Sequence, residues 1–281
     1  MKNRIVVIGN KGFIGSEIYH FLIKKKYNVL GISKNEIDLT ANNCILKLKK
    51  IINNNDTIIF VSAIAPCKDL LCIKKNVSII ENLLEAMSDK NIRHMINISS
   101  DAVYSDTKNK ISEQSETKPT TFHGIMHMLR ESLLTMYYGD ILTTIRPTLV
   151  YGLKDPHNGY GPNKFRRLIN DESNIILFGE GEEKRDHVYV GDIAELTEKI
   201  IKNTSYGIFN AVSGQTLSFN EMANYQKKLA GSNVSIINTP RIGPMHHLGL
   251  RQFKRSRAEK AFEAFEFTRI KRGIKRLMNE K

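Results

Sequence analysis

The feature that most constrains this chain is an alternation of short apolar runs with longer segments of helical periodicity. The first run, residues 4–9, is rich in β-branched residues and ends at a glycine, which is typical of a strand buried on both faces. Further runs of this kind lie at 27–33, 56–64, 94–100 and 141–147. Parallel neighbours need crossover connections, so the alternation predicts an α/β fold with a Rossmann-type, doubly wound parallel sheet.

The pattern loosens after Pro147, where turn residues accumulate. We therefore expect a Rossmann domain over 1–155, completed by a segment near 186–212. The remainder, 156–281, is expected to form mainly a smaller C-terminal substrate-binding lobe. Open α/β sheets bind ligands at the carboxyl ends of their strands, so a cleft is expected there.

Composition narrows the classes of protein to consider. The chain is 41% hydrophobic and 25% charged, which is ordinary for a globular protein, and no apolar run is long enough for a membrane span. A short basic stub leads directly into the first strand, so no signal peptide is expected and the cytoplasm is the predicted location. The cysteines Cys44, Cys67 and Cys72 form no CxxC pair, which argues against a disulfide framework or a metal site.

The formal net charge of +13 raises the question of nucleic-acid binding. The basic residues are scattered rather than clustered, which favours a general bias of the surface, and no nucleic-acid partner is expected. Such a surface would attract an anionic nucleotide.

Three glycines follow the first strand at a GxxGxxG spacing, namely Gly9, Gly12 and Gly15. Glycine suits this place because the turn is tight and the backbone must approach a pyrophosphate closely. The amides at the start of the next helix would face the anion. The sequence therefore predicts that the domain over 1–155 is a dinucleotide-binding domain, the alternative being a purely structural glycine turn.

The end of the second strand bears on the choice of cofactor. An NAD site usually places an acid there to accept the ribose hydroxyls, whereas an NADP site avoids that charge and supplies a cation. This chain has Ser33 followed by Lys34. NADP(H) is therefore favoured over NAD(H), unless Lys34 is simply one exposed lysine among many.

Six segments in order resemble the extended short-chain dehydrogenase/reductase superfamily, in its NAD(P)-dependent sugar-nucleotide epimerase, dehydratase and reductase branch. They are VIGNKGFIG (7–15), IDLT (37–40), NISSDAVYSD (97–106), IRPTLVYG (145–152), FGEGEEKRDHVYVGDIAEL (178–196) and GIFNAVSGQTLSFNEMA (207–223). The resemblance implies that Asp38 and Leu39 contact the adenine. It also implies that Ser100 hydrogen-bonds the reacting sugar oxygen and that Arg185 holds a substrate phosphate.

The chain departs from the family at its YxxxK pair. Measured from Pro119, the tyrosine and lysine positions hold His123 and His127. Their i, i+4 spacing would place both imidazoles on one helix face, and histidine is an effective general acid and base. Protonated His123 could supply the proton when a ketone is reduced, while His127 could hydrogen-bond the cofactor ribose. The alternative is a protein that has lost redox chemistry and only binds; a metal site is not expected, because a third ligand is lacking.

Among the reactions of this family, reduction is favoured by His123, whose protonated form suits a nascent alkoxide, and by the indication of NADP(H) at Ser33 and Lys34. Dehydratases of the family carry Asp and Glu after the serine or threonine, and here Ala102 replaces the glutamate. We therefore expect an NADP(H)-dependent ketoreductase of nucleotide-linked sugars in surface-polysaccharide synthesis. The alternatives are a sugar-nucleotide 4-epimerase and a non-catalytic dinucleotide-binding scaffold. The resemblance also implies a homodimer through a helix pair, with exposed apolar positions expected in NLLEAM (82–87) and ESLLTM (131–136).

Overall fold

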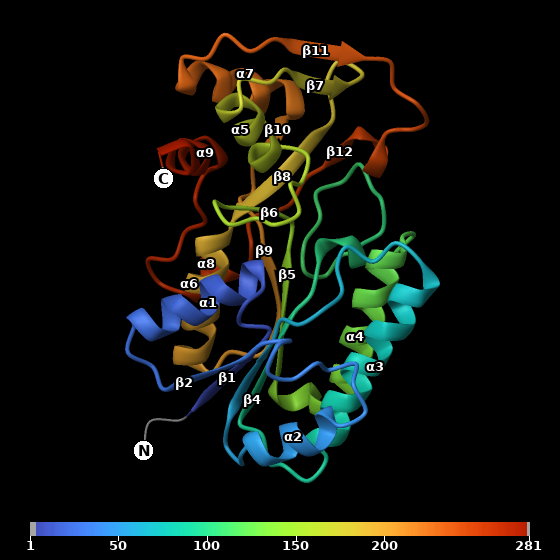
Figure 1. Ribbon diagram of the computed structural model, residues 1–281, viewed down its shortest axis with the longest axis vertical. Helices are drawn as coiled ribbons and strands as arrows, with labels where there is room; N and C mark the ends of the chain where they lie inside the picture. The colour runs from blue at the N-terminus through green and yellow to red at the C-terminus, as the bar shows by residue number, and fades with distance from the viewer. Residues whose placement is uncertain (1–3, 280–281) are drawn as a thin grey trace. The chain divides into compact units, whose positions relative to one another are not determined.

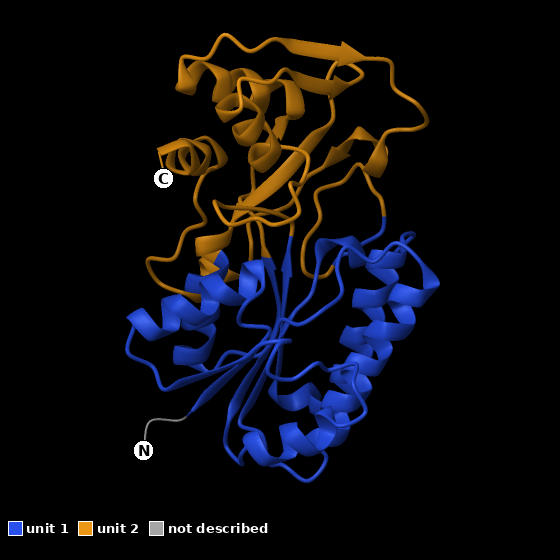
Figure 2. Cartoon of the chain, viewed as in Figure 1, with its two compact units in different colours: residues 1–105, 115–147, 193–210 blue, residues 106–114, 148–192, 211–281 orange. Residues whose placement is uncertain are grey.

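The computed structural model describes residues 4–279, and Figure 1 shows its elements along the chain. The chain divides into two compact units, coloured separately in Figure 2. Unit 1 comprises Met1–Ser105, Ser115–Pro147 and Ile193–Asn210, and unit 2 comprises Asp106–Gln114, Thr148–Asp192 and Ala211–Lys281. Residues 106–114 belong to unit 2, although they lie within the range expected for the Rossmann domain, because Ile111 forms a bridge to Phe253.

Unit 1 contains a sheet of six strands in the order β2-β1-β3-β4-β5-β9. These strands are β1 (Ile5–Ile8), β2 (Val29–Ile32), β3 (Thr57–Phe60), β4 (His94–Ile98), β5 (Leu142–Pro147) and β9 (Gly207–Ala211). The pairs from β2 through to β5 are all parallel. The predicted parallel sheet is therefore confirmed.

Helices cover both faces of this sheet. They are α1 (Phe13–Lys24), α2 (Cys44–Ile51), α3 (Leu70–Ala86), α4 (Phe122–Tyr138) and α6 (Val190–Asn203), with single turns η1 (Asp101–Val103) and η2 (Gly139–Ile141). Figure 1 shows α1 and α6 on one face and α2, α3 and α4 on the other. This is the doubly wound, Rossmann-type arrangement that the alternation predicted.

The core of unit 1 explains which apolar residues are available at its surface. Leu83 and Leu84 of α3 and Leu134 of α4 are buried in one cluster with strand residues such as Ile58. The expectation of exposed apolar positions in NLLEAM is therefore wrong, because that stretch of α3 packs inward. In ESLLTM the exposed large apolar residue is Met136, which is 79% accessible.

Unit 2 is built from small sheets and short helices. Its strands are β6 (Leu149–Tyr151), β7 (Ile175–Phe178), β8 (Lys184–Tyr189), β10 (Thr216–Ser218), β11 (Ile236–Thr239) and β12 (Leu250–Arg251). Its helices are α5 (Pro162–Asn170), α7 (Phe219–Ala230), α8 (Ala258–Ala261) and α9 (Ile270–Asn279), with the turn η3 (His246–Gly249). Phe165 of α5, Met222 of α7 and Ile274 of α9 share its apolar cluster.

The order of the strands locates the expected binding edge of unit 1. From β1 the chain goes to β2 on one side and later to β3 on the other, so the order reverses between β1 and β3. Ligands of open α/β sheets bind at the carboxyl ends of the strands at such a reversal. Gly9 directly follows β1, and Ser62 lies two residues after β3.

Candidate active site

The glycine turn after β1 has the geometry that close approach to a phosphate requires. Gly9 has φ +101°, and a Cβ on it would lie 2.8 Å from Ser62 Oγ. A Cβ on Gly15 would lie 2.1 Å from the Gly9 carbonyl oxygen, so α1 can pack against the turn only because this residue is glycine. Gly12 is the N-cap of α1, and no side chain caps the helix. The first amides of α1 are thus left for an anion, which fits the pyrophosphate of a dinucleotide.

A carboxylate that was not expected from the sequence lies at the end of β2. Glu36 Oε2 accepts hydrogen bonds from Ser33 N at 2.7 Å and from Ser33 Oγ at 2.6 Å. These bonds lower the pKa of Glu36, and the charge of Lys11 in the glycine turn lowers it further. The signal available in the sequence was an acid three residues after a serine, a spacing at which a side chain can bond back to the backbone.

The other residues expected to contact the adenosine part of the cofactor lie close to Glu36 in the sequence. Lys34 Nζ lies 3.7 Å from an Asp38 carboxylate oxygen, and the Lys34 side chain is 78% accessible. Asp38 also accepts from Thr40, and these bonds lower the pKa of Asp38. Leu39 is buried, and its carbonyl accepts from Asn82 Nδ2 at 2.7 Å. The segment is thus fixed to α3 while Lys34 remains available to solvent.

Ser100 ends the β4 segment and caps the following turn. Its Oγ accepts from the Ala102 amide at 3.1 Å, which fixes the hydroxyl at the start of η1. This turn packs on α4, because a Cβ on Gly124 would lie 2.2 Å from the Ala102 carbonyl oxygen. Glycine after His123 is therefore what allows the serine segment and the start of α4 to meet.

Helix α4 begins at Phe122 because Thr121 caps it. Thr121 Oγ1 accepts from the Gly124 amide at 3.1 Å. His123 and His127 therefore both lie on α4. Their rings meet edge to face, with centroids 4.6 Å apart and an interplanar angle of 86°.

The two imidazoles differ in environment. His123 is half-buried and its Nδ1 accepts from the Cys67 amide at 3.4 Å, so Nε2 carries the proton of the neutral ring. Burial lowers the pKa of His123, while Asp101 opposes the shift. His127 is buried and its Nδ1 has no hydrogen-bond partner among the described residues. Burial, followed by the charges of His123 and Arg130, lowers the pKa of His127 well below its usual value.

A buried polar network that was not expected from the sequence joins α4 to β5 and to the residue that follows β4. Glu131 pairs with Arg146 at 2.5 Å and also accepts from Ser99, which precedes Ser100. Ser99, Glu131 and Arg146 are all buried. The signal was two adjacent charged residues, Arg130 and Glu131, inside a largely apolar helical stretch. A buried charge needs an opposite charge or hydrogen-bonding groups around it.

Arg185, expected to hold a substrate phosphate, belongs to unit 2. It is buried on β8, and its guanidinium donates to Glu183 Oε2 at 3.0 Å and to the His246 carbonyl at 2.6 Å. It also donates to the Lys184 carbonyl at 3.1 Å, within the same unit. Nothing in the local sequence pointed to the contact with His246, because that residue comes from a distant loop.

Two further features of residues 4–279 concern membrane spans and metal sites. No helix in this range is long and apolar enough to cross a membrane. No group of three or more His, Cys, Asp or Glu side chains within the same described range is arranged to hold a metal ion.

Comparisons with known proteins agree with this architecture. A family model described as "NAD dependent epimerase/dehydratase family" matches residues 5–211. The N-acetyl-alpha-D-glucosaminyl-diphospho-ditrans,octacis-undecaprenol 4-epimerase of Escherichia coli O157:H7 is 23% identical over 259 residues, covering 85% of this chain and 76% of that protein.

Two solved structures share the fold. The UDP-glucose 4-epimerase of Thermus thermophilus in complex with NAD has a TM-score of 0.85 at 20% identity, with 98% of each chain covered. RMD from Pseudomonas aeruginosa complexed with NADPH has a TM-score of 0.83 at 17% identity, again with 98% of each chain covered.

Proposed function

Because the chain belongs to the NAD dependent epimerase/dehydratase family, we propose that it is an NADP(H)-dependent ketoreductase of nucleotide-linked sugars. We propose further that it acts in the cytoplasm, in the supply of sugars for surface polysaccharides. The two 4-epimerases described above are named for activated sugars, which supports the substrate class.

The observation that carries this proposal is the placement of Ser100, His123 and His127 at one edge of the unit 1 sheet. Ser100 follows β4, the turn after it packs on the start of α4, and the two imidazoles contact each other on that helix. A hydroxyl and an imidazole at the carboxyl ends of parallel strands are suited to polarise and protonate a carbonyl oxygen.

Each residue has a defined task in this proposal. A bound nicotinamide dinucleotide would supply the hydride, and the glycine turn would hold its pyrophosphate. Ser100 Oγ donates a hydrogen bond to the sugar carbonyl oxygen. His123, in its protonated form, donates a proton from Nε2 to that oxygen as negative charge develops on it, and is left as the neutral imidazole. His127 lies one turn further along α4 and hydrogen-bonds the cofactor ribose, which would engage a ring whose Nδ1 has no partner among the described residues.

The alternative within the family is a sugar-nucleotide 4-epimerase, which is what several relatives are named for. Reduction is favoured by His123, because an imidazolium is a better donor to a nascent alkoxide than a neutral imidazole is an acceptor from an alcohol. Ala102, after Asp101, disfavours dehydration, since the second acid is missing.

We propose NADP(H) as the cofactor because two lysines lie near the end of β2. Lys34 is exposed there, and the charge of Lys11 reaches Glu36 from the glycine turn. One structural neighbour was solved with NADPH and another with NAD, so the fold accommodates both. Glu36 opposes this preference, because its carboxylate is the kind of acceptor that an NAD ribose uses.

We also propose that the protein is a homodimer through α3 and α4. Leu70 and Leu71 on α3 are 72% and 61% exposed, and Met136 and Tyr137 on α4 are 79% and 62% exposed. Large exposed apolar side chains of this kind are suited to a protein interface.

The test is a titration of the purified protein with NADPH and NADH, followed by a panel of nucleotide-linked 4-ketosugars. Binding, then ketosugar-dependent oxidation of NADPH, is expected. Turnover of a nucleotide sugar without added NADPH would instead identify the epimerase. Dinucleotide binding without turnover, unchanged in His123→Ala, would identify a non-catalytic scaffold.

A further inference from the structure

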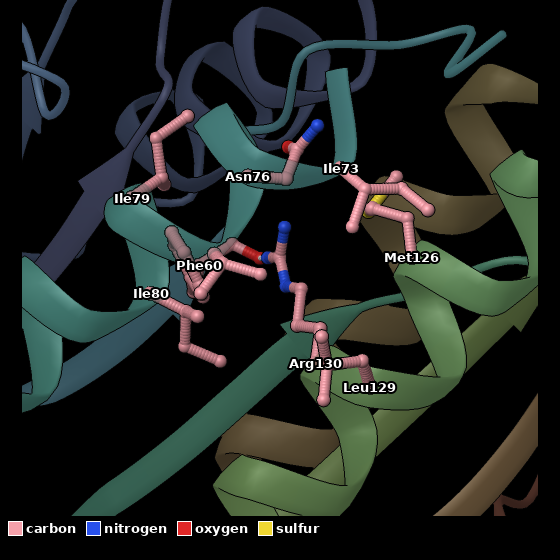
Figure 3. Close-up of a pocket in the computed structure, with 9 residues that line it drawn as sticks. Phe60, Ile73, Asn76, Ile79, Ile80, Met126, Leu129 and Arg130 are labelled. Carbon is pink, nitrogen blue, oxygen red and sulfur yellow. Dashed lines mark hydrogen bonds between the residues drawn. The ribbon is translucent and has the colours of Figure 1, made fainter. Parts of the chain in front are cut away.

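Arg130 is a buried cation of unit 1 whose hydrogen-bond acceptors are neutral groups. It lies on α4 and is 4% exposed. Its Nε donates to Asn97 Oδ1 at 2.7 Å and its Nη1 to the Ser62 carbonyl at 2.7 Å, and Nη2 donates to the Phe60 carbonyl. The guanidinium also stacks on the Phe60 ring, 3.6 Å from its centroid. Figure 3 shows the side chain extending from α4 towards Phe60 and Asn76.

Among the described residues, the groups that hydrogen-bond this cation are amide and carbonyl oxygens rather than carboxylates. The adjacent acid, Glu131, is engaged by Arg146 and Ser99, and it acts on Arg130 only through longer-range attraction. Burial outweighs that attraction and lowers the pKa of Arg130 to about 9. A buried charge that is only partly compensated exerts a strong field on its surroundings, because little water screens it.

The groups that hold Arg130 adjoin the proposed cofactor site. Ser62, which accepts its Nη1 hydrogen bond, packs against Gly9 of the glycine turn. Asn97 lies on β4, three residues before Ser100. His127 precedes Arg130 by one turn of α4, and the Arg130 charge helps to lower the pKa of that imidazole. Arg130 therefore lies at the carboxyl ends of β3 and β4, next to the point between β1 and β3 at which the strand order reverses.

We propose that Arg130 makes this site bind the reduced nicotinamide, which is neutral, more tightly than the oxidised nicotinamide, which carries a positive charge. This inference rests on the proposed function. The family's lysine position holds His127, a buried and neutral ring, so Arg130 is the cation that α4 brings to the site. Its repulsion acts on the ring of the oxidised cofactor alone, whereas its attraction for the phosphates is the same in both forms.

The experiment compares dissociation constants for NADPH and NADP⁺ in the wild type, Arg130→Gln and Arg130→Lys, all checked by thermal unfolding. Glutamine keeps hydrogen-bond donors for the carbonyls and loses the charge, while lysine keeps the charge. We expect the wild type to favour NADPH and Arg130→Gln to reduce that preference about ten-fold, with most of it kept in Arg130→Lys. Arg4→Gln is the matched control, because Arg4 pairs with Asp56 at the amino-terminal ends of β1 and β3, away from the site.

Equal weakening of both forms by Arg130→Gln would mean that Arg130 has only a structural role, and would overturn the inference. A wild-type protein that binds NADP⁺ at least as tightly as NADPH would overturn it without any variant, so the inference remains testable if Arg130→Gln does not fold. Binding of neither form would refute the proposed function itself, and the inference with it.

Discussion

At the scale of single residues, the contrast between His123 and His127 determines what each can do. His127 is buried on α4 and is held neutral, so it suits hydrogen bonding rather than proton transfer. His123 is more accessible, but the Cys67 amide donates to its Nδ1, and this bond favours the neutral ring. Proton donation by His123 therefore depends on acidic conditions.

This dependence predicts the pH profile of ketone reduction. The reaction needs protonated His123, and burial lowers the pKa of that group below 6.5. Because the protonated fraction falls as pH rises through the pKa, kcat/KM should decrease about ten-fold per pH unit on the alkaline side. In His123→Tyr the decrease should move towards ~10, the ordinary pKa of tyrosine.

Stopped-flow measurement of NADPH oxidation between about pH 5 and 10 would check this, because the range spans both ordinary pKa values. His20→Ala, on the exposed side of α1, is the control. A wild-type profile that rises with pH would exclude His123 as the proton donor.

The predicted preference for NADP(H) depends on the charge of Lys34. Its exposed ammonium would attract the 2′-phosphate, so Lys34→Ala should weaken NADPH binding roughly three- to ten-fold and leave NADH binding unchanged. Lys24→Ala, an exposed lysine at the end of α1, is the matched control. Isothermal titration with both cofactors is the measurement, and equal effects on NADPH and NADH would contradict the assignment.

At the scale of elements, the site depends on two places where a helix start approaches another backbone. Gly15 lets α1 pack against the Gly9 carbonyl, and Gly124 lets α4 pack against the Ala102 carbonyl. In both cases glycine is needed for space rather than for its backbone angles, since neither has a positive φ. The caps differ, because Thr121 closes the start of α4 whereas Gly12 leaves the amides of α1 available.

The approach of α1 can be tested with two alanine variants. A Cβ at Gly15 would lie 2.1 Å from the Gly9 oxygen, whereas at Gly12 the same oxygen is 3.4 Å away. Gly15→Ala should therefore destabilise the protein by roughly 1–3 kcal/mol or more, and Gly12→Ala by much less. Urea unfolding gives both values, and similar losses in the two variants would show that the crowding at Gly15 does not matter.

At the scale of the whole molecule, the chain buries histidines as neutral groups in both units. Burial lowers the pKa of His94 in unit 1 to about 4 and that of His187 in unit 2 to about 3. The unfolded chain takes up protons on these rings below its ordinary histidine pKa of ~6.5, while the folded chain does not. Each ring therefore lowers stability as the pH falls below that value.

Thermal unfolding should accordingly shift to lower temperature between about pH 7 and pH 5, at a cost that approaches about 1.4 kcal/mol per pH unit for each such histidine once the pH is below ~6.5. His187→Phe should reduce this dependence, because the ring already packs edge to face on Phe219 at 6.1 Å between centroids. His157→Phe, on an exposed loop of the same unit, is the control. An unchanged pH dependence in His187→Phe would contradict the prediction.

The sequence by itself determined the order of strands and helices, the glycine turn and the spacing of His123 and His127, because these depend on local periodicity and on residue type. It could not determine that Glu36 bonds back to Ser33, that Leu83 and Leu84 face the core, or that Arg185 is engaged by Glu183 and His246. Those facts depend on side-chain direction and on groups brought together from distant segments. The charge environment of the histidines, including buried Arg130, was likewise decided by the tertiary structure, since desolvation and Coulomb forces act through space rather than along the chain.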